Sequence, residues 1–332
     1  MTVSSTVVKY APGLALAAAA ALIGLVAHDQ VDALSPHVVA VVLGVAAANA
    51  GLLGTRLRTG TTLAATRVLR IGVALLGLRL SLGELGALGP ATLAAVAAVV
   101  VSTFFGAQWL ASRLGLSRGL GLLVGTGFGI CGASAIAAAE PLSDATEEEV
   151  AYSLAMVTLC GTLSIAVLPM LGSLFGLGDA DFGSWVGAAV HDVGQVVATA
   201  STRGDEALKT AVVVKLTRVA MLAPLLTMLA IAARRRGREV ADAPTPPLVP
   251  LFVAAFLVAV GVRTAGVLDD DLVATAKTLD TFLLAMGLFG LGANVRLRAL
   301  RAVGGRPLLL GLASWVLVAG VSVAAVALVP AG

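Results

Sequence analysis

Long apolar stretches, separated by short polar connections, dominate this chain of 332 residues. A helix needs about 20 predominantly apolar residues to cross the hydrocarbon core of a bilayer. Eleven stretches approach that length, at about residues 11–27, 37–54, 63–82, 90–112, 119–139, 149–171, 182–200, 208–232, 248–266, 272–293 and 307–329. The pattern therefore predicts an all-α polytopic membrane protein with about eleven transmembrane helices. It leaves no room for a soluble domain larger than a hairpin.

The composition excludes most other classes of protein. Apolar residues make up 58% of the chain and charged residues 12%, whereas soluble domains average roughly 45–50% and 25%. The two cysteines and three histidines are too scattered for a disulfide framework or a zinc motif. We therefore expect no nucleic-acid partner, no metal, no cofactor and no catalytic residues. The lipid bilayer is the predicted surroundings of the chain.

The distribution of basic residues predicts the orientation, because short cytoplasmic loops of membrane proteins carry an excess of Lys and Arg. With the N-terminus inside, fifteen of the 22 basic residues fall on inside connections: Lys9, Arg56, Arg58, Arg67, Arg70, Arg113, Arg118, Arg234, Arg235, Arg236, Arg238, Arg296, Arg298, Arg301 and Arg306. Five fall on outside connections: Arg79, Arg203, Lys209, Arg263 and Lys277. This alternation predicts an N-in, C-out topology in which Arg79 and Arg263 are surface anchors.

Two short sequence matches indicate an internal repeat. LLGLRLSL at 75–82 matches LFGLGANV at 288–295, and residues 43–53 resemble residues 260–270. The copies lie seven predicted spans apart, an odd number, so they would point in opposite directions. Inverted repeats of this kind are typical of secondary transporters. The alternative is that helices rich in Gly, Leu and Ala resemble one another by chance.

The predicted organisation is a single transmembrane transporter domain over residues 1–332. Its inverted-repeat helices occupy about 36–112 and 248–330. Its central helices, at 118–232, carry the candidate site, because three groups of unusual residues for a membrane span fall there.

The segment GTGFGICGAS at residues 125–134 predicts a break in the fifth helix. Each of its four glycines weakens a helix by about 1 kcal/mol relative to alanine. A second half that begins near Gly132 would present free N–H groups and a positive dipole end, which suit an anion. Ser134 would add a hydroxyl group at that helix start, and Cys131 directly precedes Gly132. The alternative is that the glycines only allow helices to pack closely.

The adjacent pair His191 and Asp192 forms the second group. Ionisable residues within membrane spans are functional candidates by default, and Gln195 lies one turn from both. Histidine titrates near neutrality, so the pair could carry a coupling proton, or Asp192 a sodium ion. The alternative is that one of the two residues caps a helix end near the membrane surface. The pattern leaves open whether the fifth or the seventh helix is re-entrant.

Lys215 and Arg218 form the third group and share a helix face, because they are three residues apart. Asp192 is the only acid that we place within a span. Two positive charges and one negative charge leave one positive charge for a bound anion. The alternative is that Lys215 extends to the membrane surface while Arg218 pairs with Asp192.

Four blocks of this central region carry a resemblance to a known family: GFGICGASAIAAAEP (127–141), VTLCGTLSIAVLP (157–169), WVGAAVHDVGQVVAT (185–199) and VVVKLTRVAMLAP (212–224). Over about residues 36–330 the chain resembles the YeiH-type sulfate exporter family of bacterial membrane proteins. The resemblance implies inverted repeats, broken helices that cross, and a place in the bacterial inner membrane. It places these residues in the family pattern: Cys131, Gly132, Ser134, His191, Asp192, Gln195, Lys215 and Arg218. Val193 and Gly194 depart from the Thr-Ala that often follows His-Asp in the family.

These observations together predict secondary active transport of a small anion: sulfate, sulfite, or a related sulfur oxyanion or organosulfonate. We expect export coupled to H⁺ or Na⁺, with the eight residues of the family pattern binding the substrate. One alternative is an organic carboxylate or another small solute on the same fold. Others are a structural or sensor membrane protein and, less favoured, an intramembrane hydrolase with Ser134 or Cys131 as nucleophile and His191 as base. Whether the chain forms a homodimer is left open.

Overall fold

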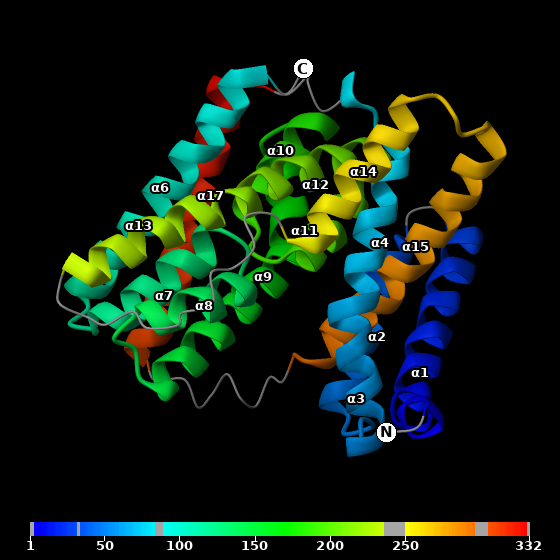
Figure 1. Ribbon diagram of the computed structural model, residues 1–332, viewed down its shortest axis with the longest axis horizontal. Helices are drawn as coiled ribbons and strands as arrows, with labels where there is room; N and C mark the ends of the chain where they lie inside the picture. Colours follow the sequence, from blue (N-terminus) through cyan, green and yellow to red (C-terminus); the bar gives the residue numbers. More distant parts are fainter. Residues whose placement is uncertain (1–2, 32–33, 84–88, 236–249, 296–304, 331–332) are drawn as a thin grey trace. The chain divides into compact units, whose positions relative to one another are not determined.

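The computed structural model describes residues 3–31, 34–83, 89–235, 250–295 and 305–330, and every regular element in that part is a helix (Figure 1). All eleven predicted stretches are helical over most of their length within these residues. The all-α class is therefore confirmed.

Seven helices of the described residues are long and apolar enough to cross a membrane: Lys9–Gln30, Thr55–Arg79, Gly89–Arg113, Glu147–Leu174, Asp205–Arg235, Asp271–Ala293 and Gly305–Leu328. Two further apolar helices, Pro36–Asn49 and Leu251–Thr264, are shorter. The predicted stretches 119–139 and 182–200 are each divided into two short helices. The count of eleven spans, the inverted repeats and the orientation stay predictions. Some basic residues used to predict the orientation lie outside the described residues: Arg236, Arg238, Arg296, Arg298 and Arg301.

The chain divides into two compact units. The first unit comprises residues 1–87, 197–205 and 251–298, and the second comprises residues 88–196, 206–250 and 299–332. The single transporter domain and its repeat boundaries stay predictions. Each unit is described below by itself.

The first unit is built around α15. Its helices are α1 (Val3–Gln30), α2 (Pro36–Asn49), α3 (Thr55–Leu63), η1 (Ala64–Val68), α4 (Leu69–Leu76), η2 (Gly77–Arg79), α14 (Leu251–Thr264) and α15 (Asp270–Ala293). The segments α3, η1, α4 and η2 form one continuous helix, with a π turn at η1. α15 packs against α1, α2 and α4. A Cβ on Gly44 of α2 would collide with the carbonyl oxygen of Phe289 in α15, so this glycine lets the two backbones touch.

The second unit surrounds α12. Its helices are α6 (Gly89–Arg113), α7 (Arg118–Gly129), α8 (Ala133–Ala139), α9 (Glu147–Leu174), α10 (Asp179–Ala189), α11 (Val193–Ala200), α12 (Asp205–Ala220), α13 (Leu222–Arg235) and α17 (Gly305–Leu328). The second half of α11 and Asp205 belong to the first unit. The middle of α12 is buried on nearly every side, which fits a run of valines and leucines that is apolar all round. Lys215, Thr217 and Arg218 interrupt that run.

Candidate functional site

Two broken helices of the second unit define the candidate site. α7 ends at Gly129 and α8 begins at Ala133, while α10 ends at Ala189 and α11 begins at Val193 (Figure 1). The break predicted near Gly132 is therefore present. A second break lies at His191 and Asp192. Each break leaves one helix end with free carbonyl groups and the next helix start with free N–H groups.

Gly132 shows why the first break needs a glycine. Its φ of +73° with ψ of −130° lies in a region that other residues rarely adopt. An added Cβ would also lie 3.0 Å from Cγ1 of Val157 in α9. The same Cβ position lies 3.7 Å from Cβ of Asp192. The two breaks are therefore in contact with each other.

Lys215 joins the two breaks on their carbonyl side. Its Nζ donates a hydrogen bond to the carbonyl oxygen of Ile130 at 2.5 Å and another to that of Val190 at 2.8 Å. One acceptor comes from each break, and the lysine is completely buried. The interpretation that Lys215 extends to the membrane surface is therefore wrong.

Arg218 lies one turn further along α12 and binds the same two helix ends. Its guanidinium donates to five carbonyl oxygens: Phe128 at 2.5 Å, Gly129 at 3.0 Å, Gly187 at 3.3 Å, Ala188 at 2.5 Å and Val190 at 3.1 Å. These are the last carbonyls of α7 and α10, where each helix dipole is negative. Both buried cations therefore stabilise helix C-termini.

The N-terminal side of the breaks is more accessible. Ser134, in the first turn of α8, is exposed, and Asp192 is partly exposed. Oδ1 of Asp192 accepts a hydrogen bond from the N–H of Gly194 at 2.8 Å, so Asp192 caps the start of α11. Gln195 accepts from the N–H of Asp192 at 3.3 Å and donates to the carbonyl oxygen of Thr158 at 3.2 Å. The side chain of Gln195 thereby ties α11 to α9.

His191 and Cys131 lie away from that accessible side. The His191 side chain is completely buried, and its ring centroid lies 4.2 Å from that of Phe128. Neither ring nitrogen of His191 has a hydrogen-bond partner within the described residues. Cys131 is a buried free thiol. The structure thus brings all eight predicted residues to the two breaks, but on different sides of them.

Sequence reasoning missed the buried ions of the first unit. Asp280 in α15 is completely buried, so Asp192 is not the only acid within a span. Arg79 is only 8% exposed and pairs with Asp280, with 3.1 Å between Nη1 and Oδ2. The interpretation of Arg79 as a surface anchor is therefore wrong. A single acid, Asp280, in the apolar run after Lys277 was the sequence signal for a buried carboxylate. Its partner Arg79 lies 201 residues away, so the ion pair could not be predicted.

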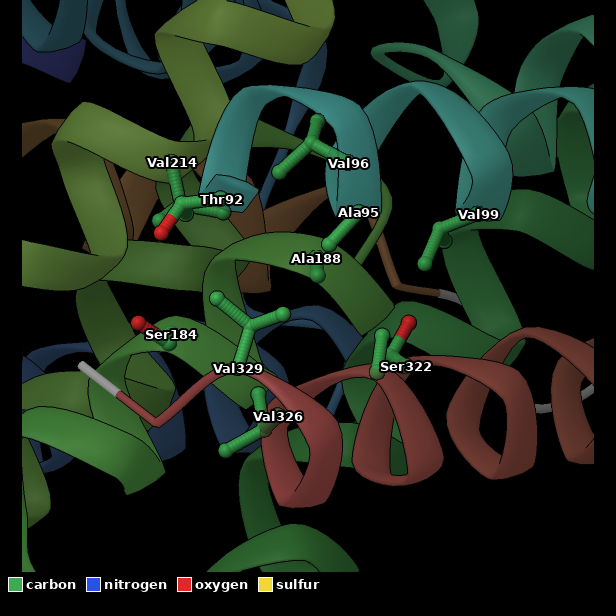
Figure 2. A pocket seen from close by; sticks show the side chains of 11 residues that line it. Thr92, Ala95, Val96, Val99, Ser184, Ala188, Val214, Ser322, Val326 and Val329 are labelled. Atoms are coloured by element: carbon green, nitrogen blue, oxygen red, sulfur yellow. The ribbon is translucent and has the colours of Figure 1, made fainter. Parts of the chain in front are cut away.

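A cavity of about 20 Å³ lies close to the end of α10. Figure 2 shows its mostly apolar lining from α6, α10, α12 and α17, with hydroxyl groups from Thr92, Ser184 and Ser322. Ala188 belongs to this wall and also accepts a hydrogen bond from Arg218. Its volume holds about one water molecule. The cavity is therefore a packing void beside the site and not the place of a substrate.

The fold, the composition and the comparisons with known proteins define a multi-pass helical membrane protein. The family described as "Conserved hypothetical protein 698" matches residues 12–311, and the chain belongs to this family, which confirms the YeiH-type resemblance. No solved structure matches the chain.

Three relatives illustrate the family. A "UPF0324 membrane protein" of Corynebacterium glutamicum is 38% identical over 316 residues, which cover 95% of this chain and 92% of the relative. A protein of the same description in Pseudomonas aeruginosa is 38% identical over 331 residues, covering 94% and 93%. The "UPF0324 membrane protein TauZ" of Paracoccus denitrificans is 37% identical over 312 residues, covering 93% and 92%. The relatives are thus similar over nearly their whole length.

Proposed function

We propose that this protein is a secondary active transporter of a small anion in the bacterial inner membrane. The substrate class is sulfate, sulfite, or a related sulfur oxyanion or organosulfonate, and the direction is export. The observation that carries the proposal is the contact between two broken helices with two buried cations on one side. Broken helices at the middle of a bundle are the usual place of substrate sites in secondary transporters.

The charges around the breaks favour an anion. Lys215 and Arg218 carry two formal positive charges, and Asp192 carries one negative charge. The dipoles add nothing to this sum, since each broken helix has a positive end as well as a negative one. One positive charge therefore remains. The hydrogen-bond donors of Lys215 and Arg218 are directed at backbone carbonyl groups. We therefore assign the anion to the side of the breaks where the next helices begin with free N–H groups, near Gly132 and Ser134.

The starts of α8 and α11 suit an oxyanion for a second reason. Free N–H groups at a helix start donate to anions along the axis of the dipole. Asp192 competes for the same place, because its carboxylate already accepts from Gly194. Protonation of Asp192, or binding of a sodium ion to it, would remove this competition. That competition provides a physical link between a coupling ion and the anion.

An intramembrane hydrolase fits the geometry less well. Such an enzyme needs a hydroxyl or thiol within hydrogen-bond reach of a base. Within the described residues the ring nitrogens of His191 have no such partner, and Ser134 lies on the exposed side. An organic carboxylate on the same fold remains the second candidate, because a carboxylate would meet the same N–H groups and the same positive charge.

Counterflow of radiolabelled sulfate and sulfite into proteoliposomes tests the proposal. We expect uptake by the wild-type protein and a strong loss in Asp192→Asn and Ser134→Ala. The control is Arg118→Gln, at the exposed start of α7, which should transport normally. Unchanged uptake in both site variants would contradict the assigned site. Uptake of carboxylates in place of both sulfur oxyanions would favour the second candidate.

A further inference from the structure

The first unit contains an ion network that the anion site does not use. Oδ2 of Asp280 lies 3.1 Å from Nη1 of Arg79, and Nη2 of Arg79 lies 2.8 Å from Oδ1 of Asp205. Oδ2 of Asp205 in turn lies 2.6 Å from Nζ of Lys277. Two positive and two negative groups therefore form a neutral chain, in which one guanidinium serves two carboxylates.

Exposure decreases steadily along this chain. The side chains of Lys277 and Asp205 are 55% and 50% exposed, that of Arg79 is 5% exposed, and that of Asp280 is 0% exposed. The network thus connects an accessible carboxylate to a buried one. Arg79 is the only link between the two carboxylates among the ion pairs of the described residues.

Asp280 is incompletely paired. Its Oδ1 is buried and has no hydrogen-bond partner within the described residues. A buried carboxylate oxygen usually accepts a hydrogen bond, since burial of an unsatisfied charged group is costly. Burial favours the neutral form of a carboxyl group, while an adjacent cation favours the charged form. Asp280 experiences both effects at once, so its charge depends on how tightly Arg79 holds it.

Few other charged groups approach Asp280 from the elements around it. α2 contributes His37, which is buried, has no partner for its ring nitrogens in the described part of the chain, and interacts electrostatically with Arg79 and Asp205. Arg70, the nearest preceding cation in the continuous helix, lies nine residues before Arg79, or about 14 Å along the axis. The remaining charged or titratable groups on α1, α3, η1 and α14 are Lys9, Tyr10, His28, Asp29, Arg56, Arg58, Arg67 and Arg263.

The neighbourhood selects a proton over a metal ion. The Nη1 atom of Arg79 lies 3.1 Å from Oδ2 of Asp280. Its positive charge would repel a metal cation bound to the Asp280 carboxylate. No group of three or more His, Cys, Asp or Glu side chains that could hold a metal occurs in the described residues. A proton needs only one free oxygen, and Oδ1 of Asp280 provides it.

We propose that Asp280 is a proton-binding site. When the proton is bound, Arg79 loses its ion pair with Asp280 and stays paired with Asp205. The proton comes from water and forms an O–H bond at Oδ1, which neutralises Asp280 and breaks its ion pair with Arg79. Arg79 keeps its second carboxylate and stays paired. The direct ion pair between η2 and α15 is then lost, and the link through Asp205 and Lys277 remains. The role of this step as a coupling step of export, in addition to the ion at Asp192, rests on the proposed function, whereas proton binding itself does not.

Infrared difference spectra of the purified full-length protein test proton binding without any substrate. Above the pH range in which exposed carboxyl groups become protonated, near pH 4, we expect the carbonyl band of a protonated carboxylic acid in the wild-type protein and its absence in Asp280→Asn. The matched control is Asp271→Asn, an exposed acid on the same helix, which should keep the band. A band of unchanged intensity in Asp280→Asn would overturn the proposal.

A second variant covers the case in which Asp280→Asn does not fold. Asp280→Glu keeps a carboxyl group but moves it by one methylene group relative to Arg79. We expect the band to remain and both its frequency and its titration midpoint to change. Spectra identical to the wild type would assign the band to another acid and overturn the proposal.

Flux measurements test the coupling role separately. With the membrane potential clamped, a pH difference of about one unit changes the accumulation ratio about tenfold for one proton per anion. We expect Asp280→Asn to lose this gradient dependence while counterflow exchange continues. If Asp280→Asn keeps the dependence, the coupling role is wrong. If the wild type moves no anion but Asp280→Asn loses the infrared band, the transport function fails and the proton site stands.

Discussion

The two units hold buried cations in two different ways. In the second unit, the acceptors of Lys215 and Arg218 among the described residues are all backbone carbonyl groups, at the C-termini of α7 and α10. In the first unit Arg79 binds two carboxylates, Asp280 and Asp205. Both arrangements satisfy donors that burial would otherwise leave unpaired, which is costly within a bilayer.

The difference lies in the acceptors. Carbonyl groups cannot take up a proton near neutral pH, so the contacts of Lys215 and Arg218 are fixed by the fold. Carboxylates can take up a proton, so the contacts of Arg79 depend on the protonation of Asp280 and Asp205. The second unit therefore uses its cations to hold broken helices together, while the first unit has an ion network that can change.

Arg218→Met provides the strongest test of the fixed arrangement. It removes the guanidinium that donates to five carbonyl groups at the ends of α7 and α10, of which Val190 keeps its hydrogen bond from Lys215. We expect a loss of at least about 3 kcal/mol, because several buried carbonyl groups lose their donor and each costs about 1–3 kcal/mol. Thermal unfolding in detergent measures it, with Arg118→Met on the exposed start of α7 as the control. Equal stability of the two variants would contradict a structural role of Arg218.

A double-mutant cycle on Arg79 and Asp280 tests the arrangement of the first unit. Each single change, Arg79→Gln or Asp280→Asn, leaves a buried charged group with a lost partner. The double variant should be more stable than the sum of the two losses predicts, by about 1–3 kcal/mol, because contacting residues couple. Apparent unfolding free energies in detergent provide the values. Additive losses would mean that the ion pair at 3.1 Å contributes nothing.

Gly132→Ala tests the backbone that the cations of the second unit hold. We expect a loss of about 1–3 kcal/mol, since a residue other than glycine is strained at a φ of +73° and its Cβ would press on Val157. Gly51→Ala in the first unit is the matched control. Its φ is +76°, but nothing lies within 4 Å of the added Cβ. A loss in Gly132→Ala no larger than that in Gly51→Ala would assign the whole effect to φ.

The smallest effect is expected at the exposed end of the ion network. Lys277 and Asp205 are about half exposed, and exposed ion pairs typically contribute about 0.2–1 kcal/mol. Lys277→Gln should therefore cost that much, and the cost should decrease at high salt. Unfolding curves at low and high ionic strength would show it. A large, salt-independent loss would mean that Lys277 belongs to the buried part of the network.

Several features of the candidate site were predictable from local sequence. Four glycines close together indicated the break near Gly132, and the three-residue spacing of Lys215 and Arg218 indicated a shared face. The acceptors of these cations were not predictable, because they lie 25–31 and 85–90 residues away in the chain. Backbone carbonyls also carry no sequence signature. For this reason the sequence could not show that both cations are directed at helix ends.

The helical, apolar character of the chain and the glycine breaks in its helices follow from the sequence, because those properties depend on residues near one another. The partners of the charged side chains depend instead on how the helices pack. Arg79 and Asp280 are separated by 201 residues, and the packing of α4 along α15 brings them together. Charge is costly to bury in an apolar chain, so the buried side chains of Arg79, Lys215 and Arg218 bind partners far away in the sequence, and those partners depend on the whole fold.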